Sequence, residues 1–339
     1  MTSISIIIPC YNCESDIVES IEAILRGTFL PMEIVLIDDS STDNTLKILE
    51  LLSTKHHSLV RFSKTDQNSG PARTRNVGAK LARGDYLFFL DSDTRLLPDA
   101  LANFSARIDQ YDAIVGMYDE EPINPGASPL YKALLYAYLL GQKGVHTYDQ
   151  FSASCAGIRS DVYWKLGGYD ERFSPGLDFE NEEFGHRISV QHRMVLDPRI
   201  RARHRFPGFW EMTSTFFYRT ALWVEMFMLR RKFSSSGGTK KSGLSSLALL
   251  ASAALLPLTT LHPLGFLPSI TAYLIYLYGY IGFYRFVIKQ RRSFLPAAII
   301  LNHYYTLVVA CGAIYGVTKI VKGDSRIFQN YSYLRKKTK

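Results

Sequence analysis

The chain has 339 residues, of which 47% are hydrophobic, and its formal net charge is +8. The charge is unevenly distributed, because residues 1–186 hold 16 Lys and Arg against 27 Asp and Glu, whereas residues 187–339 hold 23 against 4. An acidic half followed by a basic, apolar half is not typical of nucleic-acid-binding proteins, so we expect no nucleic-acid partner. The length is sufficient for one catalytic domain and a smaller second part.

Apolar runs and helical patterns alternate from the N-terminus onward. We expect strands at Ser5–Pro9, Glu33–Ile37, Leu59–Phe62 and Tyr86–Leu90, separated by helices at Asp16–Leu25, Thr45–Leu52 and Ala72–Leu81. This alternation predicts an α/β fold with a doubly wound, mainly parallel sheet. The N-terminus shows no signal-peptide pattern, so this half of the chain is expected to stay in the cytosol.

Polar side chains follow three of the predicted strands, at Tyr11-Asn12, Asp38-Asp39 and Asp91-Ser92-Asp93. In doubly wound sheets, ligands bind beyond the carboxyl ends of the strands. Carboxylates that lie close together repel each other unless a cation is present. A solvated turn is the alternative for an isolated Asp-x-Asp, but the strand-end position favours a Mg²⁺ or Mn²⁺ site that also binds a diphosphate.

Five motifs follow one another in a recognisable order: Ser5–Asn12, Ile37–Asp43, Gly70–Gly78, Ala82–Asp93 and Gly167–Glu171. Through them the first 205 or so residues resemble a family-2 glycosyltransferase of the GT-A fold. The resemblance implies an enzyme that uses a nucleotide diphosphate sugar as donor and depends on a divalent metal. A processive polysaccharide synthase is disfavoured, because the sequence lacks the Gln-x-x-Arg-Trp motif and the additional helices of a channel.

The resemblance also implies roles for single residues. Nucleotide-sugar binding falls to Pro9, Tyr11, Asn12, Glu14, Asp39, Arg75, Asp91 and Ser92, and metal binding to Asp93 with Asp91 and His204. The residues themselves allow plainer interpretations, which stay open at this point. Asn12 is suited to capping a turn, Arg73 and Arg75 to a solvated helix face, and His204 to a structural role.

The segment Phe179–Ile188 departs from the pattern of the family. In relatives it contains a Glu-Asp pair whose Asp is the catalytic base, but the matching position here is Asn181, which cannot take up a proton. Either a neighbour, Asp178 or Glu180, serves as the base, or the acceptor needs none. A phosphate monoester needs none, because it is already ionised near neutral pH. We therefore assign Asp178, Glu180 and Asn181 to the candidate catalytic group.

A basic strand closes the predicted catalytic domain and contains Arg201, Arg203 and Arg205. Such a strand is suited to meeting a phosphate or a membrane surface. We expect these arginines to bind the phosphate of a lipid-borne acceptor.

The second half contains the apolar segments. Residues 244–284 hold no Asp, Glu, Lys or Arg, and as helix this run would be roughly 60 Å long, enough for two crossings with a turn at His262–Gly265. Ser293–Thr318 is a third apolar segment, and Asn302-His303 inside it indicates a segment that is either re-entrant or packed inside a bundle of helices. Phe209–Lys232 is typical of an interfacial helix, or alternatively of an amphipathic helix packed on the catalytic domain. Residues 234–242 are typical of a linker.

We therefore expect four parts: a catalytic domain at 1–207, an interfacial helix and linker at 208–243, about three transmembrane helices at 244–321, and a basic tail at 322–339. Lys240 and Lys241 are expected on the cytosolic side. With three crossings the tail would lie outside, against the positive-inside tendency, so its side stays open. The chain is predicted to be a multi-pass protein of the cell membrane with a cytoplasmic catalytic domain.

The favoured hypothesis is transfer of a sugar from a nucleotide diphosphate donor to a polyprenyl or dolichyl phosphate. The first alternative is transfer to a hydroxyl of a lipid-linked saccharide. The second is a non-catalytic membrane protein that binds a nucleotide sugar or a lipid, although the intact Asp39, Asp91 and Asp93 argue against it.

Overall fold

The computed structural model describes residues 3–172, 179–230, 239–325 and 327. The chain forms two compact units, of which the first comprises Met1–Ile123 and Leu140–Arg205 and the second Asn124–Leu139 and Phe206–Lys339. The second unit is therefore discontinuous in sequence. We expected one continuous division after residue 207, which does not include the assignment of Asn124–Leu139 to the second unit.

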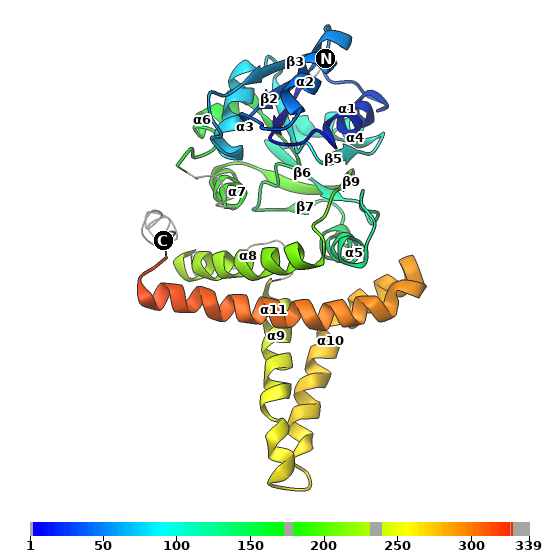
Figure 1. Cartoon of the computed structure of the whole chain (residues 1–339), viewed down its shortest axis with the longest axis vertical. Coiled ribbons are helices and arrows are strands. Elements are labelled where there is room, and N and C mark those ends of the chain that lie inside the picture. Colours follow the sequence, from blue (N-terminus) through cyan, green and yellow to red (C-terminus); the bar gives the residue numbers. More distant parts are fainter. Residues whose placement is uncertain (1–2, 173–178, 231–238, 326, 328–339) are drawn as a thin grey trace. The chain divides into compact units, whose positions relative to one another are not determined.

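The first unit is built on one sheet (Figure 1). Its strands follow the order β3-β2-β1-β4-β8-β6-β9-β5, with β7 paired to β9. The strands are β1 Ile4–Cys10, β2 Glu33–Asp38, β3 Val60–Lys64, β4 Tyr86–Leu90, β5 Thr94–Leu96, β6 Ala113–Tyr118, β7 His146–Thr147, β8 Cys155–Arg159 and β9 Met194–His204. The four strands predicted from the sequence are β1 to β4, and they are parallel to one another.

Beyond β4 the sheet is mixed rather than mainly parallel. β8 pairs antiparallel with both β4 and β6, β6 pairs parallel with β9, and β5 pairs antiparallel with β9. The α/β fold class is confirmed. The parallel prediction fails beyond β4 because it rests on strand–helix alternation, whereas β4 and β5 are separated only by a short turn.

Helices cover both faces of this sheet, as a doubly wound fold requires. They are α1 Ile17–Leu25, α2 Thr45–Lys55, α3 Pro71–Leu81, α4 Ala100–Ser105, η1 Ile108–Gln110, α6 Ser160–Lys165 and α7 Glu180–Gln191. The predicted helices correspond to α1, α2 and α3, with shifts of one to three residues at their ends.

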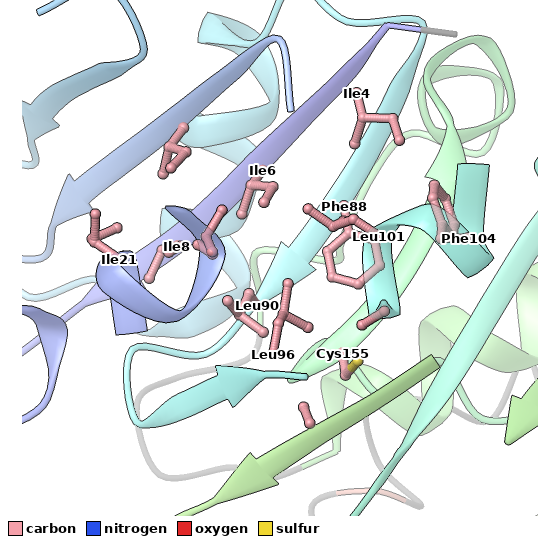
Figure 2. Close-up of a cluster of buried hydrophobic side chains, with 14 of the residues drawn as sticks. Ile4, Ile6, Ile8, Ile21, Phe88, Leu90, Leu96, Leu101, Phe104 and Cys155 are labelled. Carbon is pink, nitrogen blue, oxygen red and sulfur yellow. The ribbon is translucent and has the colours of Figure 1, made fainter. Parts of the chain in front are cut away.

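Alternate residues of each strand face opposite cores. On one side Ile4, Ile6 and Ile8 of β1 join Phe88 and Leu90 of β4 in a buried cluster with residues of α1, α2 and α4 (Figure 2). On the other side Phe89 packs edge-on against Phe151 and Tyr169, which also contact Phe184 of α7. The sheet is thus buried on both faces.

The second unit is helical. Its elements are α5 Ala127–Gly141, which ends in the first unit, and α8 Phe209–Arg230, α9 Thr239–Ala254, η2 Leu256–Thr260, α10 Phe266–Arg291, η3 Arg292–Phe294 and α11 Leu295–Lys322. The predicted linker is partly wrong, because residues 239–242 are helical; residues 234–238 lie outside the described part of the chain. The turn at His262–Gly265 is confirmed by a hydrogen bond from the Gly265 amide to the His262 carbonyl.

Within this unit α9 and α10 form an antiparallel hairpin, and α8 and α11 run side by side across its base (Figure 1). Glycines allow the close approach of α8 and α11, because a Cβ atom at Gly312 or Gly316 would lie 2.4 Å from the carbonyl oxygen of Phe217 or 2.7 Å from that of Ala221. By length and composition, the described segments Gly243–Thr260 and Phe266–Lys322 are apolar enough to cross a membrane.

The buried amide of Asn302 ties three helices of this unit together. Its oxygen accepts a hydrogen bond from Tyr131 of α5, and its nitrogen donates to Tyr276 and Tyr284 of α10. Burying an amide is costly unless its hydrogen bonds are satisfied. Of the two alternatives for this segment, the one in which Asn302 packs against other helices is confirmed.

Gly157 of β8 is required by the packing of α4 on the sheet. A Cβ atom at this position would lie 2.2 Å from the buried ring of Phe104. We predict that Gly157→Ala costs about 1–3 kcal/mol through overpacking, and that it lowers the thermal midpoint of the full-length chain in detergent by several degrees. Gly208→Ala is the matched control, since nothing lies within 4 Å of its Cβ position. Equal midpoints for the two variants would contradict this explanation.

Candidate active site

The loops after β1 and β2 meet at the carboxyl edge of the sheet. Asn12 and Ser40 adopt positive φ angles of 48° and 57°, which are uncommon for residues other than glycine. The Asn12 side-chain oxygen accepts a hydrogen bond of 2.8 Å from the Thr42 amide, and the Glu14 carboxylate accepts two from Asn44. Asn12 and Glu14 therefore brace one loop against the other, whereas Tyr11 is exposed beside them.

Asp39 is buried and fixes the loop that leads into α3. Its carboxylate accepts hydrogen bonds from the amides of Ser69 and Gly70 and from the Thr65 hydroxyl. Gly70 can occupy this position because its φ is 82°. The contact of Asp39 with a base or ribose stays a prediction.

Asp91, Asp93 and His204 come together at the end of β4. One ligand atom from each lies within 4.8 Å of the others. The pairing of β5 with β9 explains this, because Thr94 is the register partner of His204 and the Arg205 amide donates to the Asp93 carbonyl. The distance from His204 Nε2 to Asp93 Oδ1 is 3.5 Å.

The donor atoms of this cluster fit a divalent cation. Carboxylate oxygen suits Mg²⁺ and Mn²⁺, and an imidazole nitrogen is compatible with the latter. Burial, together with the charge of Asp91, raises the pKa of Asp93 even though His204 acts in the opposite direction. A cation would remove that repulsion, so Asp91, Asp93 and His204 are the residues that could hold it.

One residue that the sequence did not single out, Tyr118, adjoins His204. The ring of Tyr118 in β6 lies 4.7 Å from the His204 ring, and its hydroxyl is 2.6 Å from that of Ser154. Tyr118 is an ordinary strand residue in sequence terms. Only the pairing of β6 with β9 brings it to this position.

Arg75 is buried and joins two parts of the site. It donates to Asp91 at 2.9 Å and to Glu180 at 3.2 Å, and its guanidinium lies 5.5 Å from the ring centre of Tyr169. Burial alone would lower the pKa of Arg75, but the charges of Asp91 and Glu180 raise it, so the side chain stays charged. A solvated helix face is therefore wrong for Arg75, although it holds for the exposed Arg73.

Asn181 lies in the first turn of α7, beside Glu180. Its side-chain oxygen accepts a hydrogen bond of 3.2 Å from the Tyr169 hydroxyl. Burial raises the pKa of Tyr169, so this hydroxyl is protonated and donates. The NH₂ group, which can only donate, is the part of Asn181 that Tyr169 does not engage. Asp178 lies outside the described residues.

The three arginines expected to bind an acceptor phosphate are each paired with acidic residues of the first unit. Arg201 pairs with Asp119 and Glu120, and Arg203 with Glu121. Arg205 donates three hydrogen bonds to the carboxylate of Asp16. Their charges are thus largely compensated within the protein, and their role toward a phosphate stays a prediction.

The comparisons with known proteins agree with this geometry. Residues 5–167 match the family described as glycosyl transferase family 2. These residues form a family-2 glycosyltransferase domain. The four strands that the sequence predicted lie inside the matched range, as do Asp91 and Asp93. The helix α7 and His204 lie outside it.

Curated relatives of the glycosyltransferase domain are similar over short stretches. An uncharacterized glycosyltransferase of Haemophilus influenzae is 41% identical over 101 residues, or 30% of this chain. An Escherichia coli enzyme, UDP-Glc:alpha-D-GlcNAc-diphosphoundecaprenol beta-1,3-glucosyltransferase WfaP, is 37% identical over 103 residues, also 30% of this chain. Each alignment spans 40% of the relative's own length.

A solved structure resembles nearly the whole chain. The mannosyltransferase PcManGT of Pyrobaculum calidifontis superposes with a TM-score of 0.57 at 16% identity, over 96% of this chain and 88% of that one. At this identity the likeness establishes the fold. The expected GT-A fold is confirmed.

We predict that the full-length chain binds Mn²⁺ and that Asp93→Ala weakens this binding at least tenfold, or by about 1.4 kcal/mol. The reason is the loss of one of three converging donor atoms. Free Mn²⁺ measured by electron paramagnetic resonance gives the affinity. Asp66→Ala, which removes an exposed carboxylate outside the cluster, serves as the control. If both variants bound Mn²⁺ equally well, Asp93 would not be a ligand.

Proposed function

We propose that this chain transfers a sugar from a nucleotide diphosphate donor to the phosphate group of a polyprenyl or dolichyl phosphate. The observation that carries the proposal is Asn181. It stands where the family resemblance implies a catalytic base, and the Tyr169 hydroxyl holds its oxygen so that a hydrogen-bond donor remains. A donor at this position suits an anionic acceptor and cannot deprotonate an alcohol.

The neighbouring carboxylate supports the same proposal. Inverting transfer to a hydroxyl needs a general base, because an alcohol is a poor nucleophile until its proton is being removed. Glu180 is buried and paired with Arg75 at 3.2 Å. Taking up a proton would remove the charge of Glu180 and leave the buried guanidinium of Arg75 with Asp91 but without its second carboxylate partner. Glu180 is therefore better suited to holding Arg75 than to accepting a proton.

The proposed donor is supported by structures of similar fold. PcManGT is described in complex with GDP-Man and Mn²⁺, and GalNAc-T7, with a TM-score of 0.50 and 20% identity, with UDP, GalNAc and Mn²⁺. A divalent cation held by Asp91, Asp93 and His204 would neutralise charge on the leaving diphosphate. Arg75 holds Asp91 in position for that role.

In the proposed step a phosphate oxygen of the acceptor attacks the anomeric carbon of the donor sugar. The bond from that carbon to the donor's β-phosphate oxygen breaks, and the nucleoside diphosphate leaves with the electron pair. The product is a glycosyl phosphate with inverted configuration. No proton has to be removed from the attacking oxygen, because the second pKa of a phosphate monoester is about 6.

A membrane location would bring the enzyme to such an acceptor. The hairpin of α9 and α10 is apolar enough to enter a bilayer, and a prenyl chain partitions into the same phase. We therefore propose a membrane-bound enzyme whose glycosyltransferase domain lies on the cytosolic side.

Transfer to a hydroxyl of a lipid-linked saccharide is the second candidate. It is favoured by the similarity to WfaP, whose name specifies a diphosphoundecaprenol-linked acceptor sugar. A base would then be required, and Asp178 is the remaining carboxylate of the predicted group.

We predict that Asn181→Asp slows transfer to polyprenyl phosphate at least tenfold, or by about 1.4 kcal/mol of barrier. The substitution keeps the shape of the side chain but places a negative charge beside an anionic acceptor. The rate is measured with the full-length enzyme in detergent, with nucleotide sugars and Mg²⁺ or Mn²⁺. Hydrolysis of the donor in the absence of acceptor is the control and should be unchanged. A variant that transfers to polyprenyl phosphate at the normal rate would contradict the proposed role of Asn181.

The two acceptors can also be distinguished through Asp178. A phosphate acceptor predicts that Asp178→Asn retains at least one-tenth of the rate and that the product is an acid-labile glycosyl phosphate. A hydroxyl acceptor predicts a loss of roughly a thousandfold, or about 4 kcal/mol, and an acid-stable glycoside. Glu180 is left intact in this test, because its substitution would also disturb Arg75.

A further inference from the structure

α11 exposes one apolar stripe along its whole length. Ile300, Leu307, Ile314 and Val321 are between 41% and 81% exposed. They are seven residues apart, so they lie on one side of the helix with a drift of only about 20° per step. An uninterrupted row of exposed aliphatic side chains is costly in water.

The side of α11 opposite the stripe is occupied. Gly312 and Gly316 contact α8, and Asn302 contacts Tyr131 of α5 and Tyr276 of α10. The stripe faces away from α8 and α5 because its residues lie on the opposite side of the helix from these contacts. Trp210 and Tyr218 of α8 are also exposed, and both residue types are enriched at membrane interfaces.

The hairpin beside α11 has the dimensions of a membrane anchor. The uncharged part of α10, from Phe266 to Tyr284, measures about 28 Å as helix, close to the hydrocarbon thickness of about 30 Å. Exposed basic residues follow at the base of the hairpin: Arg285, Lys289, Arg291 and Arg292. Such residues suit the anionic headgroups of a cytosolic leaflet.

α11 runs across the base of this hairpin (Figure 1). A bilayer that the hairpin crosses therefore cannot also be crossed by α11, which is about 42 Å long and would have to lie parallel to the hairpin. α8 accompanies α11 and carries the buried Glu225, which pairs with Lys319 at 2.8 Å. Drawing this pair of helices into the hydrocarbon core would also bury Glu211 and Arg219 at high cost.

We propose that α11 lies in the plane of the bilayer, with the stripe of Ile300, Leu307, Ile314 and Val321 in the outer part of the acyl layer, and that only the hairpin of α9 and α10 inserts across it. The partner of this surface is a lipid bilayer with anionic headgroups. The proposal does not rest on the transfer reaction proposed above.

This arrangement also assigns a side to the end of α11. A hairpin returns the chain to the side on which it entered, so Lys319 and Lys322 at the end of α11 are on the same side as the start of α9. The conflict with the positive-inside tendency, which three crossings would create, does not arise.

The depth of single labels tests the proposal. Cysteines are introduced one at a time at Ile300, Leu307, Ile314 and Val321 of the full-length chain, in a Cys311→Ser background; Cys10, Cys13 and Cys155 are buried. Each is labelled with an environment-sensitive fluorophore and reconstituted in vesicles of phosphatidylcholine and phosphatidylglycerol. Quenching is compared between lipids with a nitroxide near the headgroup, lipids with one near the end of the acyl chain, and iodide in the buffer.

The matched controls are Leu267→Cys, Leu274→Cys and Ile281→Cys, which have the same seven-residue spacing on α10. We expect all four α11 positions to be quenched most by the shallow nitroxide and to the same degree, whereas the depth along α10 changes from one position to the next. A graded depth along α11 would show that it crosses the bilayer. Quenching of the stripe by iodide alone would show that it contacts no lipid. Either result would overturn the proposal.

Discussion

The geometry of the candidate site depends on the burial of Arg75 between two carboxylates. Asp91 ends a central strand and Glu180 begins α7, so one guanidinium ties the sheet to the helix that follows the aromatic cluster. Removing Arg75 from this buried arrangement is expected to cost about 3–5 kcal/mol, because the buried Glu180 would lose the guanidinium that compensates its charge. The pairing therefore fixes α7, and with it Asn181, relative to the candidate metal ligands Asp91 and Asp93. It also explains why a carboxylate beside Asn181 need not be a proton acceptor.

Positive charges at β9 are also compensated by acidic residues. Arg201 and Arg203 of β9, and Arg205 directly after it, occupy alternate positions, and each is paired with acidic residues of the first unit, including Asp16 and Asp119. Their net effect on an approaching anion is smaller than a count of arginines suggests, because paired charges largely cancel. His204 lies between two of these arginines and turns to Asp93 instead. Successive side chains of a strand point to opposite faces of the sheet. The paired arginines of β9 therefore lie on the other face from His204, the candidate metal ligand.

The sequence predicts those features that depend on local patterns and fails where distant strands must be paired. β1 to β4 follow from apolar runs, and Asp91 and Asp93 follow from their place after β4. The pairings of β8 with β4 and of β6 with β9 have no such signal, and because the second of them places Tyr118, this residue is not recognisable from the sequence as a neighbour of His204. The burial of Arg75 and the exposure of Arg73 could not be separated either, because both lie in one helical turn. The hydrogen bond from Tyr169 to Asn181 depends on how two segments pack against each other, and the spacing of apolar residues along the sequence does not predict that packing.

The discontinuous second unit has a consequence for attempts to isolate the glycosyltransferase domain. α5 belongs to the first part of the chain in sequence, yet Tyr131 bonds to Asn302, Ser128 to Tyr305, and the ring of Tyr138 lies 5.8 Å from that of Phe283. Cutting the chain before α9 would leave these side chains without their partners and expose apolar surface inside the retained fragment. A truncated fragment would then tend to associate or precipitate for reasons unrelated to its active site. The activity of this protein should therefore be measured on the intact polypeptide and not on an excised domain.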